Sequence, residues 1–537
     1  MPFGCATNCW IDRQAAMAPE SSILLGEERR LHPMSWLFAM LTQLRPFLLP
    51  LLIFLFLGKG NSWELWAALG AVFAAAYAFV HSLFYRYRVD RDELVIREGL
   101  LDRTERHIPF ARIQNVVQKQ NVLHRLFGVT ELTLESAGGQ EPEARMRVLK
   151  LADARALELL LRRQGQAHAP VGDSAALSTE QTDTLLQLPT IEVIKLGLIS
   201  NRGMLLIGSA AALWSQFGPG WSNNWIKTGA KWFGPWFNDA VHGKDLFWNT
   251  IVPAVLVLLA LMAGMRLLSV ILALLQFHGF QLTQHGERLS TEAGLLSRVR
   301  ASARPKRIQL FLKRSTWLSR RFNREMLKVD IAGGGAVKAA DEHARVKWLA
   351  PLARPEQVQQ LLGEFAPGSQ DTALNWQPLH PRAWIRRCRW PAIIRSMPAL
   401  LATFVSWFGL VLWILPVWSI AEARGFARFS RYAITDRYFF WRSGWFEQQT
   451  VILPIDKIQV IRIQRSPFDR RAGMATLNID TMGADSFGQP VLVPYLPEAT
   501  ARELAALLRA RLLEHCAPVA APAPAAIPSE LASETGI

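Results

Sequence analysis

One sequence pattern occurs three times in this chain, and that repeat constrains the fold more than any other feature. Each copy starts at a glycine: Gly99, Gly294 and Gly444. At one constant spacing after that glycine each copy has the pair Ile-Gln: Ile113 and Gln114, Ile308 and Gln309, Ile458 and Gln459. At a second constant spacing come residue types that tolerate a left-handed turn: Gly128, Asn323 and Gly473. Ungapped spacing over this length indicates three copies of one structural unit.

Each copy has the pattern of a small β structure. Tyr87, Phe280 and Tyr432 begin an alternating apolar segment, and a second strand runs up to the first glycine. A basic third strand, an alternating strand and one further strand follow, and the copy ends in a helix. The helices are expected at 152–163, 355–365 and 497–513. Several short strands and one helix within about 80 residues predict a barrel or sandwich that the helix plugs.

These anchors give the order Tyr, Gly-Leu-Leu, Ile-Pro, (Arg/Lys)-Ile-Gln, Gly, Leu-x-(Leu/Ile), Gly. This order resembles the bacterial pleckstrin-homology (PH)-like domain of the YdbS/YdbT membrane-protein family, in its multi-repeat YdbT-type form. The resemblance covers about Arg29 to Glu514. It implies a PH-like barrel after each membrane hairpin, and a shorter, single-repeat membrane partner of the same family.

The second copy departs from this pattern. It has two extra residues between Phe280 and Gly294, Arg304-Pro305 where the first copy has Ile108-Pro109, and Asn323 in place of a glycine. Whether this copy has diverged in function stays open.

Apolar segments precede each copy and predict membrane spans. Residues 63–84 and 251–275 are long enough to cross a bilayer, for which a helix needs about 20 residues. A buried helix of a soluble protein remains the alternative for each segment alone. Leu31-His32-Pro33 recurs as Leu379-His380-Pro381, so the third apolar region should match the first and hold two spans, near 391–408 and 409–428. Six spans in three hairpins follow.

The predicted fold class is an α+β membrane protein with three transmembrane helical hairpins, each followed by a small cytoplasmic PH-like β barrel or sandwich with a C-terminal helix. An N-terminal cytoplasmic segment covers 1–33. The hairpins cover 34–84, 189–276 (with a juxtamembrane helix) and 390–428, and the PH-like domains cover 85–165, 277–366 and 429–514. Linkers are expected at 166–188 and 367–389, and a disordered Ala/Pro tail at 515–537.

The charge balance indicates the orientation. There are 60 Lys and Arg against 44 Asp and Glu, a net charge of +16, and basic residues flank the first and third hairpins. Because cytoplasmic loops of membrane proteins are enriched in Lys and Arg, the termini and all three domains are expected in the cytoplasm, with the chain spanning the bacterial inner membrane several times. The loop at 218–245, which contains Trp221, Trp225, Trp232 and Trp236, is then expected along the outer interface.

The second domain holds the sharpest basic cluster: Arg304, Lys306, Arg307, Lys313 and Arg314. Each basic residue near an anionic leaflet contributes about 1 kcal/mol of attraction, so contact with anionic lipid headgroups is one interpretation. A general juxtamembrane excess of positive charge is the other. Nucleic acid is not expected as a partner, because no aromatic-interleaved binding motif accompanies the charge.

No motif for catalysis, cofactor binding or metal binding occurs in the sequence. It has no phosphate-binding Gly-x-x-x-x-Gly-Lys motif, no His-Glu-x-x-His and no Gly-x-Ser-x-Gly, and its four cysteines cannot form a disulfide scaffold. Arg266 lies inside an apolar segment, where an arginine faces a partner or lies near the end of the helix.

These patterns favour a non-catalytic inner-membrane scaffold whose three domains bind partner proteins or each other, and also membrane lipids. A role in envelope stress or resistance is a further expectation. The alternative function is transport or lipid handling, with the six helices forming a pathway, which would need several polar residues in mid-membrane.

Overall fold

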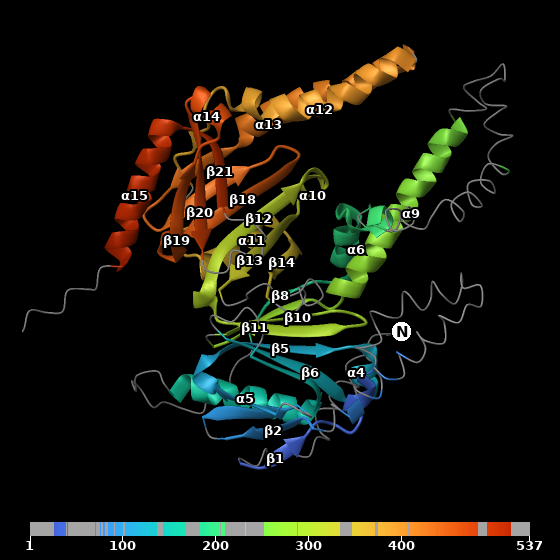
Figure 1. Ribbon diagram of the computed structural model, residues 1–537, viewed down its shortest axis with the longest axis vertical. Helices are drawn as coiled ribbons and strands as arrows, with labels where there is room; N and C mark the ends of the chain where they lie inside the picture. The colour runs from blue at the N-terminus through green and yellow to red at the C-terminus, as the bar shows by residue number, and fades with distance from the viewer. Residues whose placement is uncertain are drawn as a thin grey trace, which may run out of the picture. The chain divides into compact units, whose positions relative to one another are not determined.

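The computed structural model describes residues 26–38, 40, 70, 73, 76, 79–80, 84–90, 92–99, 103–136, 143–167, 183–204, 206–209, 231, 252–286, 288–332, 346–370, 374–405, 407–481 and 491–516 (Figure 1). The chain divides into two compact units, which are treated separately below. The first comprises Met1–Ile308 and Arg321–Val358, and the second Gln309–Arg320 and Gln359–Ile537. The first membrane hairpin, the tryptophan-rich loop and the C-terminal tail predicted from the sequence lie almost wholly outside the described residues.

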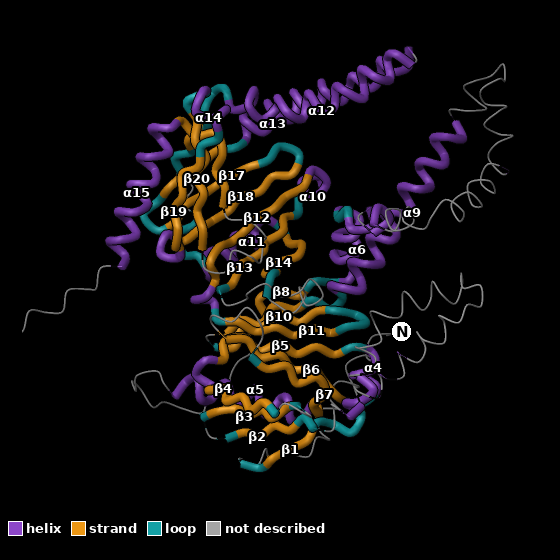
Figure 2. Tube along the Cα trace, viewed as in Figure 1, coloured by secondary structure: helices purple, strands orange, loops and turns teal. Residues whose placement is uncertain are grey.

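Each repeat contributes four strands, a 3₁₀ turn, one strand, a short helix, two strands and a longer helix, in that order (Figure 2). The first repeat contains β1 (Glu28–Arg30), β2 (Arg86–Val89), β3 (Glu93–Glu98), β4 (Thr104–Pro109), β5 (Ile113–Gln120), α4 (Val122–Leu126), β6 (Val129–Ser136), β7 (Ala144–Lys150) and α5 (Leu151–Ala167).

The second repeat contains β8 (Asp183–Gln187), β9 (Gln281–His285), β10 (Arg288–Ala293), β11 (Arg298–Ala303), β12 (Ile308–Thr316), α10 (Trp317–Arg321), β13 (Glu325–Ile331), β14 (Trp348–Ala353) and α11 (Pro355–Phe365). The third contains β15 (Gln377–Pro378), β16 (Arg431–Ile434), β17 (Tyr438–Ser443), β18 (Glu447–Pro454), β19 (Ile458–Gln464), α14 (Pro467–Arg471), β20 (Met474–Thr481), β21 (Val491–Pro497) and α15 (Glu498–Cys516). The three terminal helices predicted from the sequence are confirmed as α5, α11 and α15.

The first repeat folds as two antiparallel sheets with a helix against them. The order β1-β2-β3-β4 forms one sheet, and β5-β6-β7 belongs to another. Inward side chains of both sheets form one core with α5, including Leu94 and Ile96 from β3, Leu132 and Leu134 from β6, and Leu157 from α5. Fully burying an apolar side chain of this size contributes about 1.5–3 kcal/mol, so this core holds the two sheets and the helix together.

The third repeat has the same construction. Phe439 and Leu453 of one sheet, Leu477 and Val493 of the other and Leu508 of α15 are buried in one core. The mixed helix-and-strand class and the antiparallel sheets expected from the sequence are therefore confirmed in these two repeats.

Each repeat begins with a strand that the sequence did not predict. β1 pairs with β2, β8 with β9 and β15 with β16. These strands fall in the segments 1–33, 166–188 and 367–389, which were expected to be a terminal segment and linkers. They are short and polar, so no hydrophobic alternation marks them. In each repeat, the segment in which the sequence predicts a membrane hairpin therefore lies between the first and second strands of the sheet.

The hairpin registers correct one alignment made from sequence. The residue three positions before the first glycine pairs with Tyr87, Leu282 and Tyr432 in the three repeats. Leu282, and not Phe280, is therefore the counterpart of Tyr87, and the second repeat has no two-residue insertion. Phe280 was misleading because it is aromatic like the tyrosines, although it precedes β9.

Two helical stretches among the described residues are long and apolar enough to cross a membrane, Val255–Phe277 and Gly409–Phe429. The first belongs to α9 (Val252–Phe277), which packs against α6 (Thr190–Ile199). A side-chain carbon at Gly197 would lie 2.4 Å from the Cα of Val270, so glycine is what allows this close approach. The turn after β10 is joined to α9, because Gly294 N donates to His278 O (3.0 Å) and Leu295 N to Leu275 O (3.1 Å).

The third apolar region forms two helices that pack together. α12 (Ala383–Val405) is followed by a 3₁₀ segment at Trp407–Trp413 and by α13 (Ile414–Phe429), and both contact α12. The break falls close to the predicted boundary between Phe408 and Gly409. α12 begins well before the predicted start at Pro391 and includes the basic residues that precede it, because prolines 391 and 398 are accommodated inside the helix.

Candidate functional site

Strands from successive repeats pair edge to edge. β5 of the first repeat pairs with β11 of the second, which gives a continuous sheet in the order β7-β6-β5-β11-β10-β9-β8 (Figure 1). β12 of the second repeat pairs with β18 of the third. We call these two contacts the first and second interdomain pairs.

The two interdomain pairs have the same register. In the first, Val116 is opposite Ser302. Counted from the first glycine of each repeat, the residues at these same positions in the second pair are Phe311 and Ile452, and they too are opposite each other. One edge-to-edge geometry is thus used twice, and backbone hydrogen bonding between the strands carries it.

An arginine beside each interdomain pair reaches the neighbouring repeat. Arg125 NH1 donates to the carbonyl oxygen of Leu295 (3.3 Å), and Arg320 NH2 donates to that of Phe446 (3.4 Å). Both arginines stand at the same distance along the chain from the first glycine of their repeat. This equal spacing is present in the sequence, but it belongs to no chemical motif and so did not indicate a contact.

β4 and β19 are the counterparts of strands that form the interdomain pairs, but each is an edge strand of its own sheet. β4 is the last strand in β1-β2-β3-β4, and β19 is the first in β19-β20-β21, among the residues that the structure describes. β4 corresponds to β11 and β18, and β19 corresponds to β5 and β12. The difference shows in exposure at equivalent positions. Leu310 of β12 is 6% exposed, whereas its counterpart Val460 on β19 is 42% exposed, and Gln118 of β5 is 8% exposed, whereas its counterpart Ile463 is 37% exposed.

The β19 edge also carries exposed positive charge. The side chains of Arg462 on β19 and Arg470 on α14 are exposed and have no ion-pair or hydrogen-bond partner in the described part of the chain. Arg465, directly after β19, forms an ion pair with Glu498. Arg470 follows Gly444 at the spacing that Arg125 and Arg320 have from their own first glycines, so it is their counterpart.

The short helix beside this edge is held by a capping box. Ser466 Oγ accepts from Asp469 N (3.1 Å), and Ser466 N donates to Asp469 Oδ2 (3.2 Å). Arg386 of α12 donates to Asp469 Oδ1 (2.9 Å). Burial would raise the pKa of Asp469, but hydrogen bonds from Ser466 and Arg386 outweigh it and lower that pKa. The backbone position of Arg470 is therefore held by the capped turn of α14.

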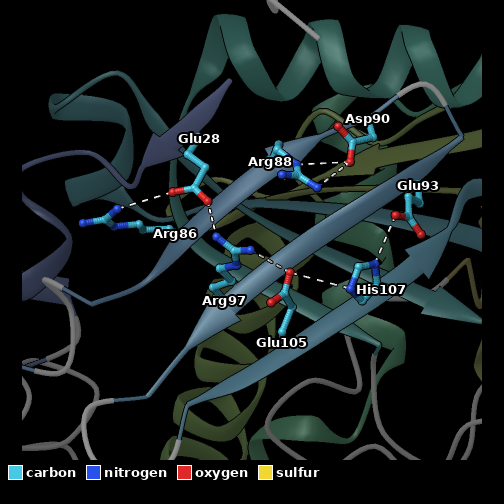
Figure 3. Close-up of polar contacts among 8 residues, drawn as sticks. All are labelled: Glu28, Arg86, Arg88, Asp90, Glu93, Arg97, Glu105 and His107. Carbon is cyan, nitrogen blue, oxygen red and sulfur yellow. Dashed lines mark hydrogen bonds and ion pairs between the residues drawn. The ribbon is translucent and has the colours of Figure 1, made fainter. Parts of the chain in front are cut away.

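The outer face of the first sheet carries a ladder of ion pairs (Figure 3). Glu28 contacts Arg86 (3.3 Å) and Arg97, and Arg97 contacts Glu105 on β4 (3.1 Å). His107 of β4 lies 3.0 Å from Glu93. The hydrogen bond from Arg97 is the main cause of the lowered pKa of Glu105. Acidic partners from the neighbouring strands thus contact most of the basic side chains on this face.

The predicted basic cluster is divided between the two units. Arg304, Lys306 and Arg307 surround a 3₁₀ turn at Pro305–Arg307 in the first unit, where the first two are exposed. Burial, with a further contribution from Arg304, lowers the pKa of Arg307. Lys313 and Arg314 lie on β12 in the second unit, opposite Thr450 and Gln449, and Arg314 forms an ion pair with Glu447. The turn and the strand are therefore separate features.

The repeat-defining residues lie at equivalent turns and strand starts. The first glycines, Gly99, Gly294 and Gly444, have φ of +111°, +119° and +95°, and Gly128, Asn323 and Gly473 have φ of +64°, +50° and +65°. Ile113, Ile308 and Ile458 begin β5, β12 and β19 and are buried. Gln309 is buried on β12, which forms an interdomain pair, and Gln459 is exposed on β19, which forms none among the described residues. Gln114 is on β5, and its side chain is not among those that the structure describes.

Arg266 has partners at the end of α6. Its guanidinium donates to the carbonyl oxygens of Leu198 (2.8 Å) and Ser200 (3.3 Å) and to Asn201 Oδ1 (3.2 Å). The two carbonyl oxygens are acceptors that a helix leaves without an internal partner at its C-terminus. Of the two sequence-based interpretations, the structure therefore shows an arginine that faces a partner. Among the described residues no group of three or more His, Cys, Asp and Glu could hold a metal ion.

A family model described as Bacterial PH domain matches this chain three times, at residues 38–165, 246–366 and 392–512. These matches cover most of the chain, which therefore belongs to the bacterial PH domain family; this is not a known enzyme family. The chain is similar to UPF0699 transmembrane protein YdbT of Bacillus subtilis (strain 168), with 20% identity over 485 residues, covering 85% of this chain and 93% of that protein. No solved structure matches.

Proposed function

We propose that this chain is a non-catalytic scaffold of the bacterial inner membrane, in which three helical hairpins hold three PH-like domains at the cytoplasmic face. The observation that carries the proposal is the interdomain strand pairing, which joins domains through backbone contacts and leaves one strand edge uncovered in the third repeat. Exposed strand edges are used by many proteins to bind extended segments of partners. The apolar helices α9 and α13 and the relative's name as a transmembrane protein support the membrane location.

The partners we propose are a single-repeat membrane protein of the same family and other copies of this chain. The test is co-expression of the tagged full chain with a single-repeat bacterial PH protein of the same organism that carries a second tag. Recovery of both from gently solubilised membranes supports the scaffold. If neither the single-repeat protein nor a differently tagged copy of the full chain is recovered, the proposal is wrong.

The orientation is tested by reporter fusions to the full chain. A cytoplasmic reporter fused after Glu514 should be active, whereas the same reporter inserted in the loop 218–245 should be inactive. The reverse pattern would contradict the proposed topology, which rests on the positive-inside rule.

We also propose that Arg304, Lys306 and Arg307 contact anionic lipid headgroups. The second domain should not be tested alone, because excising it would expose both of its interdomain strands. The full chain in nanodiscs should show slower amide exchange at 304–307 with phosphatidylglycerol than with phosphatidylcholine, and added salt should remove the difference. Replacing Arg304 and Lys306 by Glu should also remove it, whereas Arg354→Glu, at an exposed position before α11, should not. Equal exchange in both lipids would refute the contact.

For the alternative function, transport or lipid handling, the described helices offer little support. Arg266 in α9, Arg395 in α12 and Glu422 in α13 are charged residues that could mark a pathway, and Arg395 lies 3.7 Å from Glu422. Arg266 binds the end of α6, and Arg395 donates to Ser419 Oγ on α13 (2.7 Å), so both are used to join neighbouring helices.

A further inference from the structure

We infer that the outer edge of β19 is a docking site for an extended strand of another protein, in the register of the two interdomain pairs, and that acidic residues of that strand lie opposite Arg462 and Arg465. The inference rests on the interaction role proposed above and assigns its site. β4 of a second copy of this chain does not fit the site.

The β19 edge corresponds to an interface that the chain already uses twice. β5 and β12 each pair with the outer strand of the following repeat, whereas β19, their counterpart, is an edge strand of its sheet among the described residues. The side chains of Val460 and Ile463 on β19 are exposed, whereas Leu310 on β12 and Gln118 on β5, at the equivalent positions, are buried. An uncovered strand edge of this kind pairs readily with another strand.

The charges along β19 select the chemistry of the strand that docks there. At one pair of equivalent positions, the two interdomain pairs place apolar residues opposite each other, Ala301 with Val117 and Val451 with Leu312. In the same register, a second copy of this chain would place Arg106 of β4 opposite Arg462 of β19. Like charges directly opposite in neighbouring strands are destabilising.

The same conflict recurs further along the two strands. The interdomain pairs place Arg298 opposite Gln120 and Gln448 opposite Ser315. A second copy would place Arg103 opposite Arg465. Two repulsive pairs in one short strand pairing oppose head-to-tail assembly of this chain, and acidic residues at those two positions would convert both to attraction.

Arg470 provides a further contact for the docking strand. Its counterparts Arg125 and Arg320 donate to carbonyl oxygens just after the first glycine of the neighbouring repeat. Arg470 is exposed on the capped turn of α14 without a partner in the part of the chain that is described. It is therefore placed to donate to the backbone just before the docking strand.

The test uses the full chain in detergent and two fluorescent peptides. One has the native sequence of residues 99–110, and the other carries Arg103→Glu and Arg106→Glu. We expect the acidic peptide to bind about fivefold to tenfold more tightly than the native peptide, measured by fluorescence anisotropy at low salt. In the full-length variant Arg462→Glu/Arg465→Glu the order of the two affinities should reverse.

Matched variants separate the edge from general attraction to positive charge. Arg470→Ala should weaken binding of the acidic peptide about threefold to tenfold, whereas Arg471→Ala, at the adjacent exposed position, should leave it unchanged. A gain of function follows as well: the full-length variant Arg103→Glu/Arg106→Glu should assemble head to tail, as light scattering would show, and adding Arg462→Glu/Arg465→Glu should disassemble it.

The inference is overturned if neither peptide binds, or if reversing the charge at position 462 leaves the affinity unchanged. It is also overturned if the native peptide binds as tightly as the acidic one, because a second copy of this chain could then be the occupant. If the proposed scaffold function is wrong, the wild-type chain recovers no partner in the co-purification experiment, whether or not the peptides bind. If the wild-type chain and the Arg462→Glu variant recover the partner equally, the scaffold stands and the β19 edge is not its site.

Discussion

Arg266, in the apolar helix α9, donates a hydrogen bond of 2.8 Å to the carbonyl oxygen of Leu198 in the last turn of α6. Ser269 Oγ, one turn further along α9, donates to Ser200 O (2.8 Å). The negative end of the α6 dipole and the carbonyl groups at its C-terminus therefore stabilise the positive charge of Arg266, which would otherwise be costly within such an apolar helix.

Replacing Arg266 by Ala should loosen the end of α6. Loss of hydrogen bonds to a charged donor costs about 1.5–3 kcal/mol, so the melting temperature in detergent should fall and proteolysis near residues 200–203 should speed up. Arg266→Lys should restore part of the stability, because the charge remains. Leu267→Ala, at an exposed neighbouring position, is the control, and an equal loss in both variants would contradict the capping role.

The stability of the first unit should depend on an ion pair between Glu192 and Arg324. Arg324 Nε and NH2 donate to the two carboxylate oxygens of Glu192 (2.9 and 2.8 Å), and Lys195 adds a third contact (3.0 Å). The hydrogen bond from Arg324 is the main cause that lowers the pKa of Glu192 to about 2. Since the folded pKa lies below the unfolded one, this stabilisation is present above pH 4.5 and is lost as the pH falls toward 2.

Glu192→Gln should therefore cost about 1–2 kcal/mol at neutral pH, since the pair is partly exposed, and should flatten the acid dependence of unfolding between pH 4.5 and pH 2. Denaturant unfolding followed at several pH values measures both effects. Glu356→Gln is the matched control, because Glu356 also lies in the first turn of a helix but has no ion-pair partner among the described residues. An unchanged acid profile in Glu192→Gln would refute the linkage.

The repeated Leu-His-Pro motif should make the starts of two helices sensitive to acid. His32 Nδ1 accepts from Met34 N (3.3 Å), and His380 Nδ1 accepts from Arg382 N (3.1 Å). A protonated imidazole could not accept these bonds, and burial is the main cause that lowers the pKa of both residues. Their stabilisation is thus present above the ordinary histidine pKa and is lost as the pH falls through the lowered folded value.

His380→Ala should cost about 0.5–2 kcal/mol, as does the loss of other helix caps, whereas His380→Asn should retain most of the stability and remove the pH dependence. NMR titration of the imidazole, together with unfolding at mildly acidic pH, tests this. A His380 pKa at or above its ordinary value would contradict it.

Two glycines of the third repeat should respond differently to a methyl group. At Gly473 (φ +65°) a side-chain carbon would have open space, so Gly473→Ala should cost only the backbone strain, about 1–2 kcal/mol. At Gly444 (φ +95°) that carbon would lie 1.8 Å from Glu447 O, so the turn itself must move. Gly444→Ala should therefore be clearly more destabilising in thermal unfolding, and Gly473→Asn should be tolerated, as Asn323 is at φ +50°.

The elements with local signals could be predicted from sequence. Ile113, Ile308 and Ile458 each begin a strand as the alternation indicates, and the terminal helices follow their apolar periodicity. The strands β1, β8 and β15 escaped prediction because their stability comes from partners far along the chain: Glu28 is opposite Arg88, and Gln377 is opposite Tyr432. The interdomain pairs escaped for the same reason, since nothing near Val116 in the sequence indicates Ser302 as its neighbour.

The identical register of the two interdomain pairs has a consequence for how such chains change in length. Each repeat has one strand that can pair with the preceding repeat and one that can pair with the following repeat. A duplicated repeat inserted in frame can therefore join its neighbours without a new interface. Only the first strand of the former kind and the last of the latter, β4 and β19, need sequences of their own. Natural relatives with other numbers of repeats should therefore vary most at these two strands and least at the strands between them.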